Sequence, residues 1–146
     1  MLLQASQILE KAQEEILADE ITRLFKEKEF IELSERWLII NHRKTVYRIM
    51  QAYGNDIKRQ VLMCTAENAL TASQIIEKTN LPISSTYREI DELISDGLLL
   101  RVGYDKTQKK TASKLLALIQ NMKIDIDGNR ISVLIKTNKS NDAFLL

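Results

Sequence analysis

Two helical patterns separated by a very short break constrain the fold of this chain more than any other feature. Thr71 is expected to cap the first helix, which buries Ile75 and Ile76 and ends near residue 80. Leu81-Pro82 forms the connection, and proline is tolerated in the first turn of the helix that follows. That second helix is predicted over residues 83–96 and stops at Gly97. Two helices of these lengths joined by three or four residues are typical of a helix-turn-helix.

After the second helix the sequence changes to a strand pattern. Residues 98–102 are strand-like, residues 103–110 are polar and typical of a turn, and residues 111–119 indicate a returning strand. We therefore expect a hairpin with a basic tip directly after the helix pair.

A second hairpin is predicted near the C-terminal end of the sequence. Residues 122–127 alternate between polar and apolar types, and Asp127-Gly128-Asn129 is a strong signal for a tight turn. The positions expected to face inward are Ile124, Ile126, Ile131, Val133 and Ile135. Residues 122–137 are thus predicted to pack as a hairpin on the preceding domain, and residues 138–146 to form a flexible tail.

Residues 1–42 are predicted to form a helical extension. Residues 2–28 have apolar side chains at helical spacing, which fits either a helix packed on its own domain or a helix that forms a dimer. A second helical region is expected over residues 32–53, although residues 37–40 fit a buried helical turn or a short strand equally well.

This second helix is expected to end at the glycine that follows it. Gly54 is predicted to adopt the left-handed conformation, and Asp56 to cap the next helix.

The charge is unevenly distributed along the chain. The formal net charge is only +1, but residues 1–35 hold four basic and nine acidic residues, whereas residues 36–146 hold seventeen basic and eleven acidic ones. An acidic front end followed by a basic body is compatible with a domain that meets nucleic acid.

Composition excludes several other classes. A chain of 146 residues with 4 Gly, 1 Pro and 45% hydrophobic residues is neither collagen-like nor intrinsically disordered. No apolar run is long enough to span a membrane, no secretory signal opens the sequence, and a single cysteine fits a reducing compartment. We therefore expect a soluble protein of the cytoplasm.

The segment NLPISSTYREIDELISDGLL, residues 80–99, resembles the recognition helix and following strand of winged helix-turn-helix transcription regulators. The stretch VYRIMQAYGNDIKRQVLMCTAENALTASQIIEKT, residues 46–79, is similar to the start of the ArsR-like branch found in archaeal regulators. That branch has a D-x-x-R helix, whose positions are occupied by Asp56 and Arg59. Asn80 stands where glycine is usual, and Thr86 stands where valine or isoleucine is usual. The Thr86 hydroxyl then needs a partner, which a backbone carbonyl in the preceding turn would supply.

The resemblance covers about residues 44–119 and implies a mainly α fold with a small β component (α+β). The expected organisation is a winged helix-turn-helix DNA-binding domain over residues 43–121, between the N-terminal helical extension and the C-terminal β-hairpin. The N-terminal extension is the candidate dimerisation region, with help from the hairpin. The implied function is sequence-specific binding of double-stranded DNA by a homodimeric transcription regulator.

Chemistry favours particular residues for contact with DNA. The N-terminus of a helix offers free N–H groups to phosphate, and the hydroxyls of Ser84 and Ser85 lie there. Arg88 points outward if the apolar positions point inward, and an arginine can bind both acceptors of a guanine edge. The lysines of the first hairpin suit the DNA backbone or the minor groove. The candidate DNA-binding residues are Thr71, Ser73, Ser84, Ser85, Thr86, Tyr87, Arg88, Arg101, Lys106, Lys109 and Lys110.

Several alternatives stay open at this point. The serines can act only as helix caps, Arg88 can pair with Glu92, and surface lysines can serve only solubility. The winged domain can instead mediate protein–protein contact within a transcription or repair assembly. A small-molecule effector pocket lined by Trp37, Phe30 and Tyr53 is a further option.

The sequence offers little support for other chemistry. His42 and Cys64 are the only soft metal ligands, and two separated residues do not make a zinc site. There is no glycine-rich phosphate loop and no nucleophile elbow. We therefore expect neither an enzyme nor a bound cofactor.

Overall fold

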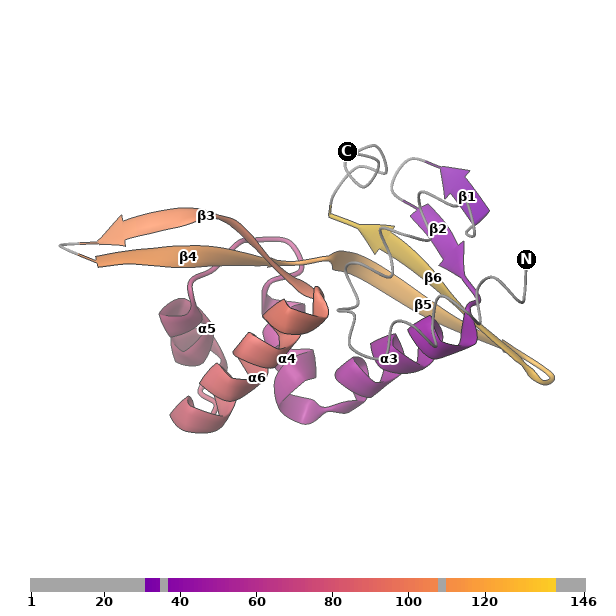
Figure 1. Cartoon of the computed structure of the whole chain (residues 1–146), viewed down its shortest axis with the longest axis horizontal. Coiled ribbons are helices and arrows are strands. Elements are labelled where there is room, and N and C mark those ends of the chain that lie inside the picture. Colours follow the sequence, from indigo (N-terminus) through magenta and orange to yellow (C-terminus); the bar gives the residue numbers. More distant parts are fainter. Residues whose placement is uncertain (1–30, 35–36, 108–109, 139–146) are drawn as a thin grey trace.

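The computed structural model describes residues 31–34, 37–107 and 110–138, which form an α+β arrangement of helices and antiparallel sheets (Figure 1). In chain order the elements are β1 (Ile31–Ser34), β2 (Trp37–Ile40), α3 (Arg43–Gly54), α4 (Asp56–Cys64), α5 (Ala72–Thr79), α6 (Ile83–Asp96), β3 (Leu99–Thr107), β4 (Lys110–Ala117), β5 (Ile119–Asp127) and β6 (Arg130–Thr137). The described part of the chain therefore confirms the α+β class.

The strands form two separate sheets. β3 pairs with β4 in a two-stranded sheet, and the other four strands pair in the order β1-β2-β6-β5. Only Leu118 separates β4 from β5, so one almost continuous strand passes from the first sheet into the second (Figure 1). Asn138 fastens this junction, because its side-chain amide donates to the carbonyls of Ala66 at 2.8 Å and Ala117 at 2.7 Å.

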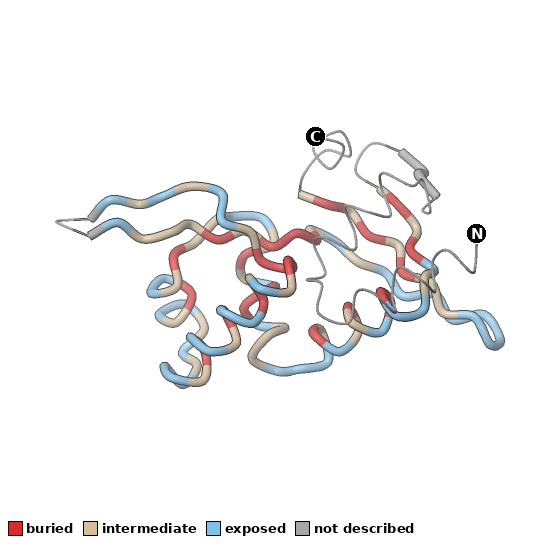
Figure 2. The backbone as a smooth tube through the Cα atoms, viewed as in Figure 1, coloured by how far each residue is buried: buried red, intermediate tan, exposed pale blue. Residues whose placement is uncertain are grey.

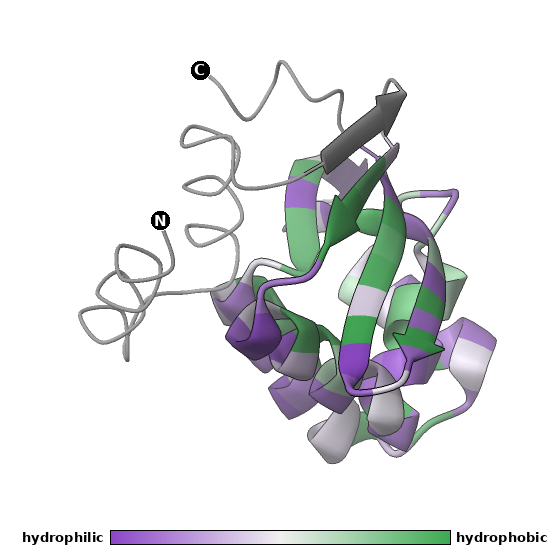
Figure 3. Ribbon diagram, turned by 90° about the vertical axis from the view of Figure 1, so that its right-hand side faces the viewer, coloured by the Kyte–Doolittle hydropathy of each residue, from purple (hydrophilic) through white to green (hydrophobic). Residues whose placement is uncertain are grey.

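One hydrophobic core joins the two sheets and the helices. In Figure 1 the four helices lie along one side of the molecule, with α3 beside β5 and β6 and the other three beside β3 and β4. Figure 3 shows hydrophobic residues concentrated along the strands of the four-stranded sheet. The buried apolar side chains form one connected cluster: Leu38, Ile40, Val46, Ile49, Ala52, Val61, Leu62, Ile75, Ile90, Leu93, Leu98, Leu99, Leu115, Ala117, Leu118, Ile119, Val133 and Ile135.

The helix predicted to begin at residue 32 is wrong for residues 32–34, which lie in strand β1. Of the two possibilities left open for residues 37–40, the structure has the strand. Burial alternates along β2, where Leu38 and Ile40 are buried and their neighbours are only partly so, and this period of two is that of a strand. β2 pairs with β6, which lies far along the sequence, so the strand is stabilised by a partner that local propensity does not reveal. The predicted helix over residues 2–28 lies outside the described residues.

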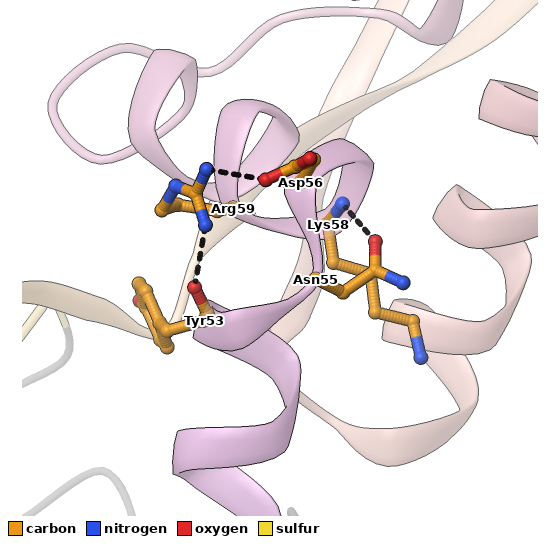
Figure 4. A network of polar contacts seen from close by, with 5 residues as sticks. All are labelled: Tyr53, Asn55, Asp56, Lys58 and Arg59. Carbon is orange, nitrogen blue, oxygen red and sulfur yellow. Dashed lines mark hydrogen bonds and ion pairs between the residues drawn. The ribbon is translucent and has the colours of Figure 1, made fainter.

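The junction between α3 and α4 also differs from prediction (Figure 4). α3 ends at Gly54, which is not left-handed, and the next residue, Asn55, is extended. Asn55, not Asp56, caps α4, because its side-chain oxygen accepts a hydrogen bond from the backbone N–H of Lys58 at 3.0 Å. Aspartate and asparagine are equally good cap residues, so composition alone does not decide between neighbours.

Asp56 has a different partner. Its carboxylate lies 2.7 Å from Nη2 of Arg59, whose Nη1 donates to the carbonyl of Tyr53 at 3.1 Å (Figure 4). The D-x-x-R pair thus satisfies a free carbonyl at the end of α3 and holds the start of α4 against it. Burial raises the pKa of the Tyr53 phenol to about 12.

Both predicted hairpins are present. The first one is longer than expected, because β3 extends to Thr107 and β4 begins at Lys110, so pairing continues into the predicted turn. In the second one the turn follows Asp127, with Gly128 at φ +57°, and Val133 and Ile135 are buried as predicted.

The prediction that Ile124 and Ile126 face inward to a core is wrong. Their side chains are 46% and 66% exposed. Alternation places them on the same face as Val133 and Ile131, their partners on β6, but β5 is the outer strand of the sheet. The hairpin tip extends past the region that α3 covers (Figure 1), so this part of the apolar face meets solvent.

Candidate nucleic-acid interface

The first helix of the pair, α5, begins with a complete capping box. The Thr71 hydroxyl accepts a hydrogen bond from the N–H of Gln74 at 3.3 Å, and the Gln74 side chain accepts one from the N–H of Thr71 at 2.9 Å. The predicted cap is confirmed. The side chain of Thr71 is buried and occupied by this role, whereas Ser73 is exposed.

The turn between α5 and α6 has the predicted backbone. Asn80 lies in the left-handed region at φ 57° and ψ 30°, which asparagine tolerates better than most residues. Pro82 then precedes the first residue of α6, and Gly97 ends that helix at φ 82°. Three residues thus join the two helices and fix the direction in which α6 leaves α5.

Thr86 is buried inside this arrangement. Its side chain is 0% exposed, and its hydroxyl donates to the carbonyl of Pro82 at 2.6 Å. The prediction that the hydroxyl finds a carbonyl in the preceding turn is confirmed. Thr86 and Thr71 therefore serve the helix pair itself, and their side chains do not belong to the exposed surface.

The outer face of α6 carries the other predicted residues. Ile90 and Leu93 are buried, while Ser84, Tyr87 and Arg88 are exposed, as the helical period predicts (Figure 2). Ser85 is partly buried. Sequence reasoning missed Ile83, an exposed apolar side chain in the first turn; its position next to Pro82 was the available signal.

Lys58 of α4 lies close to two of the acidic side chains of α6. Its Nζ lies 3.6 Å from a carboxylate oxygen of Glu89 and 3.6 Å from one of Glu92. Glu89 Oε2 is buried and accepts no hydrogen bond from the described residues, so the nearby ammonium group compensates its charge. The alternative in which Glu92 pairs with Arg88 is not what the structure shows: Arg88 forms no ion pair with any described residue.

The β3–β4 hairpin presents the second group of predicted residues. Arg101 and Lys106 are exposed, and Lys110 begins β4 opposite Thr107. Lys109 lies outside the described residues. The pairing register shifts between Arg101 and Gly103, so a bulge interrupts the strand near its base.

Two further features of this hairpin were not predicted. Tyr104 on β3 is among the most exposed large hydrophobic side chains of the described residues. Residues 103–107 were predicted to be a turn, and recognising them as part of a strand would have indicated that the Tyr104 side chain is exposed. Leu70, just before α5, forms an antiparallel bridge with Leu115 of β4, with N–H to carbonyl distances of 2.9 and 2.7 Å. The hairpin is therefore attached to the start of the helix pair.

The two soft metal ligands considered from the sequence, Cys64 and His42, lie on different helical segments. Cys64 is partly buried, and burial raises the pKa of its thiol although Lys78 acts in the opposite direction. His42 lies at the start of α3, where Nδ1 is 3.3 Å from the Thr45 hydroxyl. Among the described residues no group of three His, Cys, Asp or Glu side chains is arranged to hold a metal ion.

Of the three residues suggested for an effector pocket, two are among the described residues. Phe30 lies outside them, Trp37 has the ammonium of Lys136 5.9 Å from its ring centre, and Tyr53 lies at the far end of α3. A groove of about 540 Å³ lies elsewhere, between the start of α3 and the β5–β6 hairpin. Its lining combines charged side chains, Arg43, Arg130, Asp125 and Asp127, with apolar ones such as Ile39 and Val46.

Comparison with known proteins adds no relative: no family model, no curated protein and no solved structure matches this chain. Within the described ranges, none of the helices combines the length and apolar character that crossing a bilayer requires. The geometry of the helix pair and the hairpin is therefore the basis for the function proposed below.

Proposed function

We propose that this protein binds double-stranded DNA as a winged helix-turn-helix transcription regulator. In this proposal α6 enters the major groove and the β3–β4 hairpin is the wing, which contacts the backbone or the minor groove beside it. The D-x-x-R pair and the order of elements favour the ArsR-like branch of archaeal regulators. Homodimer formation is part of the proposal, because two copies read a longer site than one recognition helix does.

The observation that carries the proposal is the attachment of the hairpin to the helix pair. α5, a three-residue turn and α6 are followed directly by β3 and β4, and the bridge between Leu70 and Leu115 ties β4 to the residue before α5. This order and pairing resemble those of a winged helix and support the proposal, because they bring the outer face of α6 and the basic hairpin into one unit.

The chemistry of the exposed residues supports contact with DNA. Ser84 and the free N–H groups of the first turn of α6 suit a phosphate oxygen. Arg88 is exposed and has no carboxylate partner among the described residues, so its guanidinium is available to a guanine edge. In the hairpin, Arg101 and Lys106 offer exposed positive charge.

The charge of α6 favours the alternative, a winged helix that binds another protein. The helix holds Arg88 as its only basic residue and four acidic residues, Glu89, Asp91, Glu92 and Asp96. Lys58 compensates two of these carboxylates, but Asp91 and Asp96 form no ion pair with any described residue and would repel phosphate if they faced it. Exposed Ile83 and Tyr87 also suit a protein surface.

Selection of bound sequences from a random duplex pool distinguishes the two functions. We expect enrichment of a short sequence, repeated with two-fold symmetry if a dimer binds, and an affinity that decreases steeply as salt increases. The control is the same selection without protein. Failure to retain any duplex at low salt would overturn the proposal and favour the protein-binding alternative.

A further inference from the structure

The outer edge of β5 is unpaired among the residues that the structure describes. β5 is the terminal strand of the four-stranded sheet, with β6 as its neighbour there. It is nine residues long and carries exposed Ile124 and Ile126. A long edge strand with exposed apolar residues is a template for pairing with another strand.

The pairing register shows which backbone N–H and carbonyl groups of β5 point toward β6 and which point away from it. Asp127 and Arg130 flank the two-residue turn, and residues that flank such a turn exchange both of their backbone hydrogen bonds. Because bonded and non-bonded pairs alternate, Asp125 and Lys123 also bond to β6. The N–H and carbonyl groups that point away from β6 therefore belong to Met122, Ile124 and Ile126.

The sequence of this edge is complementary to itself. If two copies of β5 pair antiparallel about Ile124, each Ile124 lies opposite its equivalent and each Met122 lies opposite Ile126. These are the residues whose outward backbone groups are free, so both chains can exchange hydrogen bonds. The same register places Lys123 opposite Asp125 twice, in the non-bonded positions where side chains approach most closely.

The neighbouring antiparallel registers lack this complementarity. Pairing centred one residue earlier would place Lys123 opposite its equivalent, and pairing centred one residue later would do the same for Asp125. Like charges directly opposite each other are destabilising. Lys123 and Asp125 are exposed and form no ion pair with other described residues, so both charges are available to a partner.

We propose that the occupant of this edge is a second copy of the chain, paired through β5 about Ile124 so that the two four-stranded sheets become one continuous sheet. The inference goes beyond DNA binding and does not depend on it, because self-association is measured without DNA. The β5–β6 tip lies at the opposite end of the molecule from the β3–β4 hairpin (Figure 1), so this dimer leaves that hairpin uncovered.

Sedimentation equilibrium of the full chain tests the proposal. We expect a dimer at micromolar concentration, and we expect Ile124→Lys to raise the dissociation constant about tenfold or more, because it places two lysines face to face at the centre of the interface. Val102→Lys is the matched control: Val102 lies on the other hairpin and is 45% exposed, against 46% for Ile124. A monomeric wild-type chain, or a dimer that Ile124→Lys leaves unchanged, would overturn the proposal.

A charge exchange tests the register. Lys123→Asp or Asp125→Lys alone makes both cross-strand pairs repulsive, and we expect each to raise the dissociation constant about tenfold. The double variant Lys123→Asp/Asp125→Lys restores opposite charges and should recover wild-type association. Recovery supports the antiparallel register about Ile124. A double variant no tighter than the single ones rejects that register, and far-ultraviolet circular dichroism verifies that each variant is folded.

Discussion

The two hairpins of this protein have similar lengths but opposite surroundings. The β3–β4 hairpin forms a two-stranded sheet of its own, attached by the bridge at Leu70, whereas the β5–β6 hairpin belongs to a four-stranded sheet. Residues 99–117 of the first hairpin hold five basic residues and one acidic residue; residues 119–137 of the second hold three basic and two acidic ones. A one-sided charge suits a polyanion, while a mixed charge at a sheet edge suits a complementary strand.

In our proposals the two ends of the molecule therefore bind different partners. The β3–β4 end would contact DNA together with α6, and the β5 end would contact a second copy. Leu118 and Asn138 join the two ends through the same hydrophobic core, so the hairpins are expected to unfold together even though they would bind different partners. Two properties can therefore be tested: whether the two ends unfold in one transition, and whether they bind different partners.

The largest expected effect is on the junction between the hairpins. Leu118 is buried in the single connected core, so Leu118→Ala should lower the free energy of unfolding by about 2–5 kcal/mol. Denaturant titrations measure this with two signals: far-ultraviolet circular dichroism for the helices and the fluorescence of Trp37, the single tryptophan, for the four-stranded sheet. Coincident transitions in both signals are expected, and a Trp37 transition that separates from the helical one would contradict a shared core.

Local sequence signals predicted the helix pair well. The cap at Thr71, the left-handed Asn80 and the carbonyl partner of Thr86 all depend on residues within four positions, and all three are confirmed. The orientation of Arg88 followed from the helical period alone. The function of that surface stays a prediction, because these same features also stabilise a helix pair that binds no DNA.

The other end was predicted less well because its structure depends on distant residues. For β2 the sequence left a helical turn and a strand equally open, because its partner β6 lies far along the sequence and local composition did not distinguish the two. Alternation correctly placed Ile124 on the apolar face of its strand, but it carries no information on how far α3 extends over that face. The wrong prediction at Asp56 has a local cause: Asp56 pairs with Arg59, and the neighbouring Asn55, an equally good cap residue, provides the cap of α4.

The second prediction uses pH to test the end of α3. Burial raises the pKa of Tyr53 from 10.0 to about 12, so the neutral phenol stabilises the folded state below pH 10 and this contribution is lost between pH 10 and about 12. The loss should be about 2 kcal/mol, after allowance for the part of the ring that water reaches. Tyr53→Phe should remove this part of the alkaline destabilisation. An equal loss of stability in both proteins over this range would show that the Tyr53 phenol ionises freely in the fold.

The third prediction concerns sequence discrimination by α6. If Arg88 contacts a base edge, Arg88→Ala should reduce the difference in binding free energy between selected and unrelated duplexes by about 1–3 kcal/mol. Thr86→Val on the same helix is the control, because the Thr86 side chain is fully buried and valine keeps its shape. Fluorescence anisotropy with both duplexes measures the effect. Unchanged discrimination in Arg88→Ala would remove this residue from the interface.

The smallest expected effect separates the two hairpins directly. Lys106 is an exposed cation of the β3–β4 hairpin, and Arg130 is an exposed cation beside the turn of the β5–β6 hairpin. If only the first hairpin contacts phosphate, Lys106→Ala should reduce the slope of log affinity against log salt by about one, because one fewer counterion is released. Arg130→Ala should leave that slope unchanged. Equal reductions in both variants would mean that DNA reaches both ends of the molecule. The proposal that only the β3–β4 hairpin contacts phosphate would then be wrong.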